Sequence, residues 1–137
     1  MPDIFLEVIS PERVVFTGQV KSVVLPCAEG DMTVLYGHEP VVTTMNPGLI
    51  VVTDSEGLGH TAFIAGGFVE ITAYKVGILA NRALALADLT PEHLEEEILH
   101  HETIRDATRD AKRRQEAEFM ISRLKQVRTA LAFQTAR

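Results

Sequence analysis

Ser10-Pro11-Glu12-Arg13, Phe16-Thr17-Gly18, Glu29-Gly30-Asp31 and Val34-Leu35-Tyr36-Gly37-His38-Glu39-Pro40 form the most informative stretch of this chain. Short runs of β-branched and aromatic residues alternate there with glycine, proline and aspartate, the residues that reverse a strand. Composition alone would not predict so specific a string. The stretch indicates that the N-terminal part is a domain of short strands.

Glycine divides the chain into two parts. All nine glycines lie between Gly18 and Gly77, and Pro91 is the only proline after Asn81. Strands need frequent reversals, whereas helix interiors exclude turn-forming residues. The composition therefore predicts a β domain over residues 1–87 and a helical segment over residues 88–137.

Within the β domain, six runs are the clearest strand candidates: 4–9, 20–25, 48–53, 61–64, 68–72 and 76–79. In the run 20–25 both faces are partly apolar, which favours a sandwich over a single open sheet. Gly66-Gly67-Phe68 is expected to be a turn into a core strand, with Phe68 buried.

The helical segment opens with helix-start signals. Thr90 is a good N-cap and Pro91 suits the first helical position. A first apolar face joins Leu94, Ile98 and His101, and a longer stripe follows at Ala117, Met120, Ile121, Leu124, Val127 and Leu131. The pattern thins between these two faces, so we expect two helices with a turn within 106–110. A single long helix is the alternative, because no glycine or proline marks that turn.

Charge and composition exclude several functions. The chain has 137 residues, a net charge of -6 and a pI of about 5.3, which argues against nucleic acid as a partner. No apolar run approaches the length that crosses a bilayer, so direct membrane insertion is not expected. The N-terminus lacks a secretory or transit signal, which favours retention in the compartment of synthesis. The single cysteine, Cys27, excludes an internal disulfide and is expected to be a buried thiol.

The opening stretch, together with Pro47-Gly48, Ala65-Gly66-Gly67-Phe68 and Leu79-Ala80, resembles the N-terminal part of the epsilon subunit of bacterial F-type ATP synthases. The resemblance runs through most of the first 87 residues. It implies a flattened ten-stranded β-sandwich followed by a C-terminal antiparallel two-helix hairpin. It also implies a non-catalytic rotor subunit of the central stalk, bound peripherally at the cytoplasmic face of the bacterial inner membrane. Such a subunit couples ion flow through the membrane ring to ATP synthesis.

The resemblance implies partners for particular residues. The loop that carries Glu29, Asp31 and His38 is expected to contact the polar loops of the c-ring. The turn that carries Ser10 and Arg13 is expected to face the gamma subunit. The alternatives are that His38 only caps a turn and that Arg13 is only a solvated side chain.

The basic residues of the helical segment are expected to dock onto acidic segments of the alpha/beta catalytic hexamer when the hairpin extends, and so to inhibit ATP hydrolysis. They are Arg105, Arg109, Lys112, Arg113 and Arg123. In one continuous helix, Arg105, Arg109 and Lys112 would share a narrow face. The alternative is a solvated face balanced by neighbouring carboxylates.

No cofactor or metal is expected. Some relatives bind ATP through an Ile/Leu-Asp-x-x-Arg-Ala signature, but this chain has Ala87-Asp88-Leu89-Thr90-Pro91-Glu92 at the nearest place. Without the arginine no cation meets a phosphate, so ATP binding is predicted to be weak or absent. Two other functions remain open: a stand-alone β-sandwich binding module with a helical tail, and a small hydrolase or metal-dependent isomerase that pairs His38 with Asp31.

Overall fold

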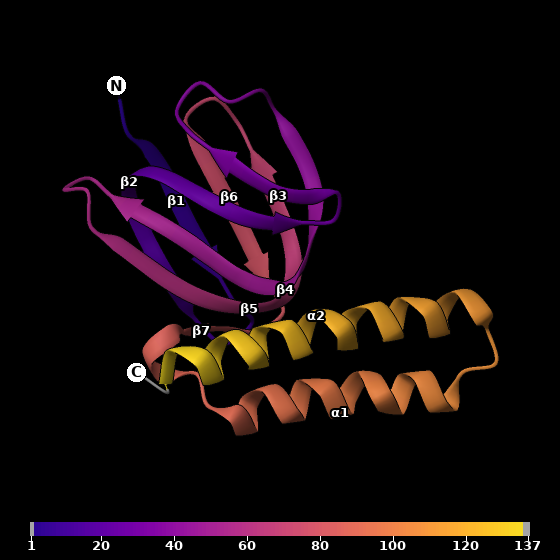
Figure 1. Ribbon diagram of the computed structural model, residues 1–137. Coiled ribbons are helices and arrows are strands. Elements are labelled where there is room, and N and C mark those ends of the chain that lie inside the picture. The colour runs from indigo at the N-terminus through magenta and orange to yellow at the C-terminus, as the bar shows by residue number, and fades with distance from the viewer. Residues whose placement is uncertain (1, 136–137) are drawn as a thin grey trace. The chain divides into compact units, whose positions relative to one another are not determined.

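The chain divides into two compact units, Met1–Ala87 and Asp88–Arg137. The computed structural model describes the backbone of residues 2–135 and the side chains of residues 2–133. The first unit is built of strands and the second of two helices (Figure 1).

The first unit holds seven described strands: β1 (Ile4–Ile9), β2 (Val14–Cys27), β3 (Gly30–Val34), β4 (Val41–Asp54), β5 (Gly59–Ile71), β6 (Lys75–Ala80) and β7 (Ala83–Ala85). They pair in the order β1-β6-β5-β4-β2, and β1 also pairs with β2, so the ring of strands closes. β3 extends from β2, and β7 pairs with β5. Among the described strand pairs, only β1 and β6 run parallel. A short 3-10 helix, Leu86–Asp88, spans the boundary between the two units in the sequence.

Three of these strands are unusually long. β2 and β4 have 14 residues each and β5 has 13. The first part of β5 pairs with β7 and the second with β6, while β2 pairs first with β1 and then with β3. Figure 1 shows these strands curving between the two layers of a flattened sandwich. The expected sandwich is confirmed, but it has seven continuous strands rather than ten, because hydrogen bonding continues around the bends.

The bend of β5 lies at Gly66 and Gly67. Both have positive φ angles, +101° and +154°, which side-chain-bearing residues rarely adopt. A Cβ added to Gly67 would lie 2.3 Å from the Leu79 carbonyl oxygen. The expected turn between two strands is therefore a corner within one strand. The prediction that Phe68 is buried was wrong: Phe68 is 41% exposed and the next residue, Val69, is buried.

The core of the first unit is formed by alternating inward-facing side chains. In β1 these are Ile4, Leu6 and Val8, which are at most 1% exposed. Further core residues come from every long strand, among them Val20, Val23, Leu25, Ile50, Ile64, Val69, Ile71, Val76 and Ile78. Because side chains alternate along a strand, each inward residue leaves its neighbours on the outer surface.

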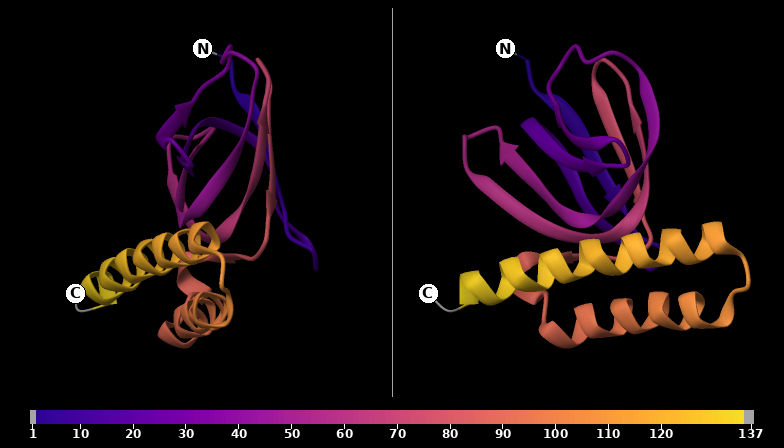
Figure 2. Two further views of the ribbon diagram at one scale, coloured as in Figure 1. Left: turned by 90° about the vertical axis from the view of Figure 1, so that its right-hand side faces the viewer. Right: turned by 45° about the vertical axis from the view of Figure 1, so that its right-hand side comes forward.

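The second unit is a helical hairpin of α1 (Pro91–Ala107) and α2 (Ala111–Thr135). The two helices lie side by side and antiparallel in Figure 1 and in the right-hand view of Figure 2, which confirms the two-helix prediction over a single long helix. The link between them needs no glycine or proline. Thr108 Oγ1 accepts a hydrogen bond from the Asp110 N–H at 3.2 Å, and Asp110 Oδ1 accepts one from the Lys112 N–H at 3.0 Å. A hydroxyl and a carboxylate thus make the turn and cap α2.

The start of α1 also follows the sequence. Thr90 Oγ1 accepts from the His93 N–H at 3.3 Å, while His93 Nδ1 accepts from the Thr90 N–H at 3.1 Å, which makes a capping box with histidine in the usual place of glutamate. Apolar side chains on both helices are buried: Leu94, Ile98, Ala117, Ile121, Leu124, Val127 and Leu131. Arg128 donates to Glu95 at 2.5 Å across the hairpin.

The corner of β5 gives a direct test. Gly67→Ala should lower the free energy of unfolding of the sandwich by about 2 kcal/mol or more, because the new Cβ meets backbone at a positive φ. Gly59→Ala is the matched control, since it lies in the same strand and its added Cβ meets nothing within 4 Å. Urea unfolding measures both. Equal stability of the two variants would contradict this account of the corner.

Candidate docking surfaces

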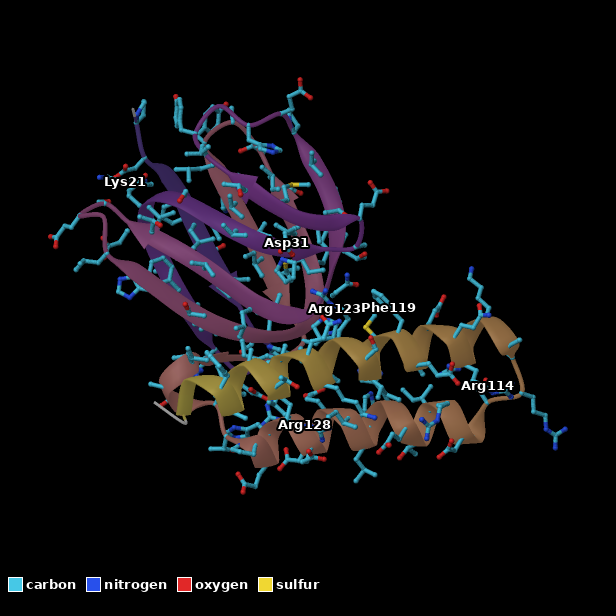
Figure 3. The ribbon with its side chains drawn as sticks, viewed as in Figure 1. Lys21, Asp31, Arg114, Phe119, Arg123 and Arg128 are labelled. Carbon is cyan, nitrogen blue, oxygen red and sulfur yellow. The ribbon has the colours of Figure 1, made fainter. Side chains whose placement is uncertain are left out.

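Glu29 and Asp31 lie at the hairpin between β2 and β3. Both side chains are exposed, and Gly30 between them has a φ of +127°, which permits the tight reversal. Both residues line a recess of about 420 Å³. Its other walls include Met32 of β3 and residues 41–43 of β4. The structure therefore brings these two carboxylates together at one rim (Asp31 is labelled in Figure 3).

His38 lies beyond the opposite end of β3, in the loop 35–40. Its Nδ1 donates to the Glu39 carbonyl oxygen at 2.7 Å, and the Gly37 N–H donates to the Ala73 carbonyl oxygen at 2.6 Å. The length of β3 thus separates His38 from the Glu29–Asp31 hairpin, and no hydrogen bond joins His38 to Asp31 in the described part of the chain. An acid–base pair of these two residues is not formed.

The loop that holds His38 carries apolar surface that sequence reasoning missed. Leu35 and Tyr36 are exposed, and Tyr74 in the adjoining turn between β5 and β6 is 66% exposed. The Gly37–Ala73 hydrogen bond holds the two turns together. The sequence could have indicated this surface, because Leu35, Tyr36 and Tyr74 are large apolar residues within predicted turns, where side chains are usually exposed. This end of the sandwich thus offers aromatic rings with polar tips, a surface suited to a mixed polar and apolar partner.

Ser10 and Arg13 form the reversal between β1 and β2. The Ser10 N–H donates to the Arg13 carbonyl oxygen at 2.9 Å, and the Ser10 hydroxyl donates to the same oxygen at 3.3 Å. Ser10 is buried and Arg13 is exposed. Of the two expected gamma contacts, only Arg13 presents its side chain, while Ser10 holds the turn.

A row of side chains crosses the outer face of β4, β5, β6 and β1, and it includes apolar residues that sequence reasoning assigned to the core or overlooked. The strand register aligns Thr44, Phe68, Leu79 and Ile9. We call these four residues the outer-face row. Phe68 is 41% and Leu79 56% exposed. The alternation of side chains along a strand could have revealed this row. Val69 and Ile78 point inward, so their neighbours Phe68 and Leu79 must point outward.

Because α1 and α2 are separate helices, the basic residues of the second unit do not share the narrow face that one continuous helix would give them. Arg105 Nε donates to Asp106 at 2.9 Å, and this contact raises the pKa of Arg105 and lowers the pKa of Asp106. Arg109 lies in the link, and Lys112 and Arg113 lie in the first turn of α2. Because the helix is interrupted between Ala107 and Ala111, these residues lie around the turn of the hairpin instead.

Two further arginines have different surroundings. Arg114 donates to the Thr108 carbonyl oxygen at 3.0 Å and so caps the end of α1. It lies at the turn end of the hairpin in Figure 3, with Arg128 near the other end. Arg123 lies further along α2 than the turn and is half-buried. A recess beside the link is lined by Arg109 and Arg113 with Thr103, Ile104, Ala107 and Thr108.

Several titratable groups are perturbed by their surroundings. Burial, with a smaller effect from nearby Asp31, raises the pKa of the Cys27 thiol, which keeps it protonated and inert. A hydrogen bond from His60, reinforced by the Leu58 and Glu56 N–H groups, lowers the pKa of Asp54 in the turn between β4 and β5. Burial, and then the neighbouring His100 ring, lower the pKa of His101.

The exposed groups offer docking contacts more readily than chemistry. Among the described residues, no three His, Cys, Asp or Glu side chains converge in a way that could hold a metal ion. No helix within residues 2–135 has the length and apolar character needed to span a membrane. The fold thus defines a class of architecture: a flattened β-sandwich followed along the chain by a two-helix hairpin.

Comparisons with known proteins agree with this class. Residues 3–86 match the family "ATP synthase, Delta/Epsilon chain, beta-sandwich domain". The ATP synthase epsilon chain of Parvibaculum lavamentivorans is 40% identical over 123 residues, which cover 89% of this chain and 92% of the relative. That of Maricaulis maris is 36% identical over 126 residues, covering 92% and 94%.

Solved structures share the fold. A chain in the Euglena gracilis mitochondrial ATP synthase structure, described as OSCP/F1/c-ring in rotational state 1, superposes with a TM-score of 0.72 at 23% identity, over 96% of this chain and 82% of its own length. A chain in the central stalk/c-ring structure of the Tetrahymena thermophila mitochondrial ATP synthase has a TM-score of 0.62 at 7% identity, over 90% and 94%.

This chain therefore belongs to the ATP synthase epsilon chain family. As an epsilon chain it is a non-catalytic subunit of ATP synthase. The family assignment replaces the hydrolase, the isomerase and the stand-alone binding module as explanations of the sequence.

His101 gives the hairpin a predicted pH dependence. Its pKa in the folded hairpin lies below the ordinary 6.5 of the unfolded chain, so the unfolded chain binds more protons below about pH 6.5. The stability of the hairpin should therefore fall as pH drops from 7.5 to 5.5, and His101→Gln should reduce that fall. Thermal unfolding monitored by helix circular dichroism measures it, with the exposed His60→Gln as control. An unchanged pH slope in His101→Gln would contradict the assignment.

Proposed function

We propose that this chain transmits torque within the rotor, with its sandwich fixed to the gamma subunit and resting on the c-ring. The observation that carries the proposal is the presence of two distinct exposed surfaces on one rigid sandwich. One is the outer-face row, and the other is formed by the turns at the two ends of β3, which carry Glu29, Asp31 and His38. A part that moves as one body between two partners needs such separate surfaces on a stiff support.

The gamma contact is proposed at the outer-face row and the turn of Arg13. The row is supported by its exposure, since large apolar side chains on a sheet face indicate a docking site when they are contiguous. Ile9 pairs with Leu79 and directly precedes Ser10, so the row continues into the turn that carries Arg13. Ser10 acts in this proposal by holding that turn.

The c-ring contact is proposed at Glu29, Asp31 and His38. Exposed carboxylates on a tight hairpin can accept hydrogen bonds from the polar loops of another protein without a large apolar interface. His38 contributes through the loop that the Gly37–Ala73 hydrogen bond ties to the turn of Tyr74. The subunit would then sit peripherally at the cytoplasmic face of the bacterial inner membrane.

The hairpin is proposed to inhibit ATP hydrolysis when it extends toward the alpha/beta hexamer. Arg109, Lys112 and Arg113 around the hairpin turn would meet acidic segments there, with Arg105 and Arg123 further along the helices. The charge at this turn supports the proposal, because Arg109, Lys112 and Arg113 are all exposed. Tight ATP binding is not part of the proposal, since Pro91 and Glu92 stand where a phosphate-binding arginine would be needed.

Phe68→Glu tests the gamma contact. A charge placed in the outer-face row should weaken binding to the cognate alpha/beta/gamma complex at least about 30-fold, the effect of losing a well-packed anchor residue. Val51→Glu is the matched control, because Val51 is 42% exposed, close to the 41% of Phe68. Val51 lies in the second half of β4, whereas Thr44, the residue of the outer-face row in that strand, lies in the first half. Isothermal titration calorimetry with the complex lacking this subunit measures both. Equal binding by both variants would place gamma elsewhere.

The double variant Arg109→Glu/Arg113→Glu tests the hairpin. It should retain binding but raise ATP hydrolysis by the reconstituted complex several-fold, because like charges then oppose the docking of the hairpin turn. Lys125→Glu, an exposed charge reversal on the same helix, should leave hydrolysis unchanged. A chain that ends at Ala87 should show the fully released rate. Identical hydrolysis with all of these chains would remove the inhibitory role.

A further inference from the structure

β3 is an edge strand in the described part of the sandwich. It pairs only with β2, from Val23↔Val34 to Cys27↔Gly30. β1 pairs with an earlier part of β2, from Val14 to Val20, so it does not cover β3. Asp31 and Thr33 have exposed side chains. An edge strand of this kind presents unpaired backbone groups to a partner.

Pro26 shows which groups those are. In an antiparallel ladder, alternate residue pairs exchange two hydrogen bonds, and the pairs between them exchange none. Pro26 has no N–H, so the pair Pro26↔Asp31 is of the second kind, and Leu25↔Met32 is of the first. The N–H and C=O groups of Asp31 and Thr33 therefore point away from β2. Outside the strand ladder, neither residue's backbone has a hydrogen bond to another backbone group among the described residues.

A recess adjoins the hairpin between β2 and β3, lined by Cys27 and residues 29–32 together with residues 41–43. β3 forms one wall and residues 41–43 of β4 form another, with Val42 60% exposed. Those β4 residues pair with β5 on one side, whereas the pairing of β2 with β4 starts only at Met45. Glu29 and Asp31 place two carboxylates on the rim, with no ion-pair partner among the described residues.

We propose that the free edge of β3 is a strand-addition site that takes an extended, lysine- or arginine-bearing segment of a partner protein. The backbone of that segment pairs with Asp31 and Thr33, and its basic side chain meets the carboxylates of Glu29 and Asp31. The inference rests on the proposed function, which brings this hairpin to the polar face of the membrane ring. It adds that backbone pairing along β3, as well as side-chain contact, secures the subunit there.

Amide hydrogen exchange tests this directly. The full-length chain is compared free and bound to detergent-solubilised ATP synthase from which its own copy of this subunit has been removed. The amides of Asp31 and Thr33 should exchange at least about tenfold more slowly on binding, while those of Met32 and Val34, already bonded to β2, change little. Binding without protection of Asp31 and Thr33 would overturn the inference alone. Absence of binding would overturn the proposed function with it.

Thr33→Pro is the matching variant. It removes one outward N–H and leaves the ladder to β2 intact, and edge strands accept proline at such positions. Affinity for the depleted synthase should fall about fivefold, as expected for one lost hydrogen bond, whereas Thr33→Val should bind like the natural chain. Equal affinity of the two variants would overturn the inference. If Thr33→Pro does not fold, the exchange measurement decides.

Self-association would also be visible. Sedimentation velocity of the free chain at rising concentration should show a monomer. Amide hydrogen exchange on the same samples should show unprotected Asp31 and Thr33 amides. A dimer in which those amides become protected would identify a second copy of the chain as the occupant, and would overturn the assignment to a basic segment of a partner.

Discussion

The continuity of β5 through its glycine corner is the constraint on which the sandwich depends. Gly66 and Gly67 turn the strand at positive φ, and Gly67 passes so close to Leu79 that no side chain fits between them. β4 and β5 can therefore stay hydrogen-bonded from Val41↔Ile71 to Thr53↔Gly59 while β5 changes its other neighbour from β7 to β6. Closure of the strand ring and burial of the core both follow from that unbroken pairing.

The same corner decides which side chains reach the surface. Beyond it, Val69 and Ile71 point inward, so Phe68 must point outward. The outer-face row is thus a consequence of strand period rather than of hydrophobicity. In the proposed function the gamma subunit contacts this row, and the packing of the core fixes the direction of its side chains. At the other edge, the ladder register has a comparable effect: Pro26 lacks an N–H, so Pro26↔Asp31 is a pair without hydrogen bonds, and the backbone groups of Asp31 and Thr33 point away from β2.

The second unit depends on local interactions. Thr90 and His93 start α1, and Thr108 and Asp110 end it and start α2. These are neighbouring residues, so the existence of two helices and the position of their turn could be predicted from the sequence. The arrangement of Arg105, Arg109 and Lys112 could not, because their relative directions change completely when a continuous helix becomes a hairpin. The charges of these residues can be known from the sequence, but whether they share one face depends on where the helix is interrupted.

The sequence by itself determined the family, the division near residue 87, the strand-rich and helical classes of the two parts, and the capped start of the first helix. All of these rest on local residue chemistry, or on motifs that stay within a few positions of each other. Only the tertiary structure decided that 61–64 and 68–72 are one strand, that Phe68 is exposed, and that His38 is separated from Asp31. The physical reason is that exposure and proximity depend on hydrogen-bonded neighbours distant in the chain. A strand's own residues do not specify which side of it a partner strand will cover.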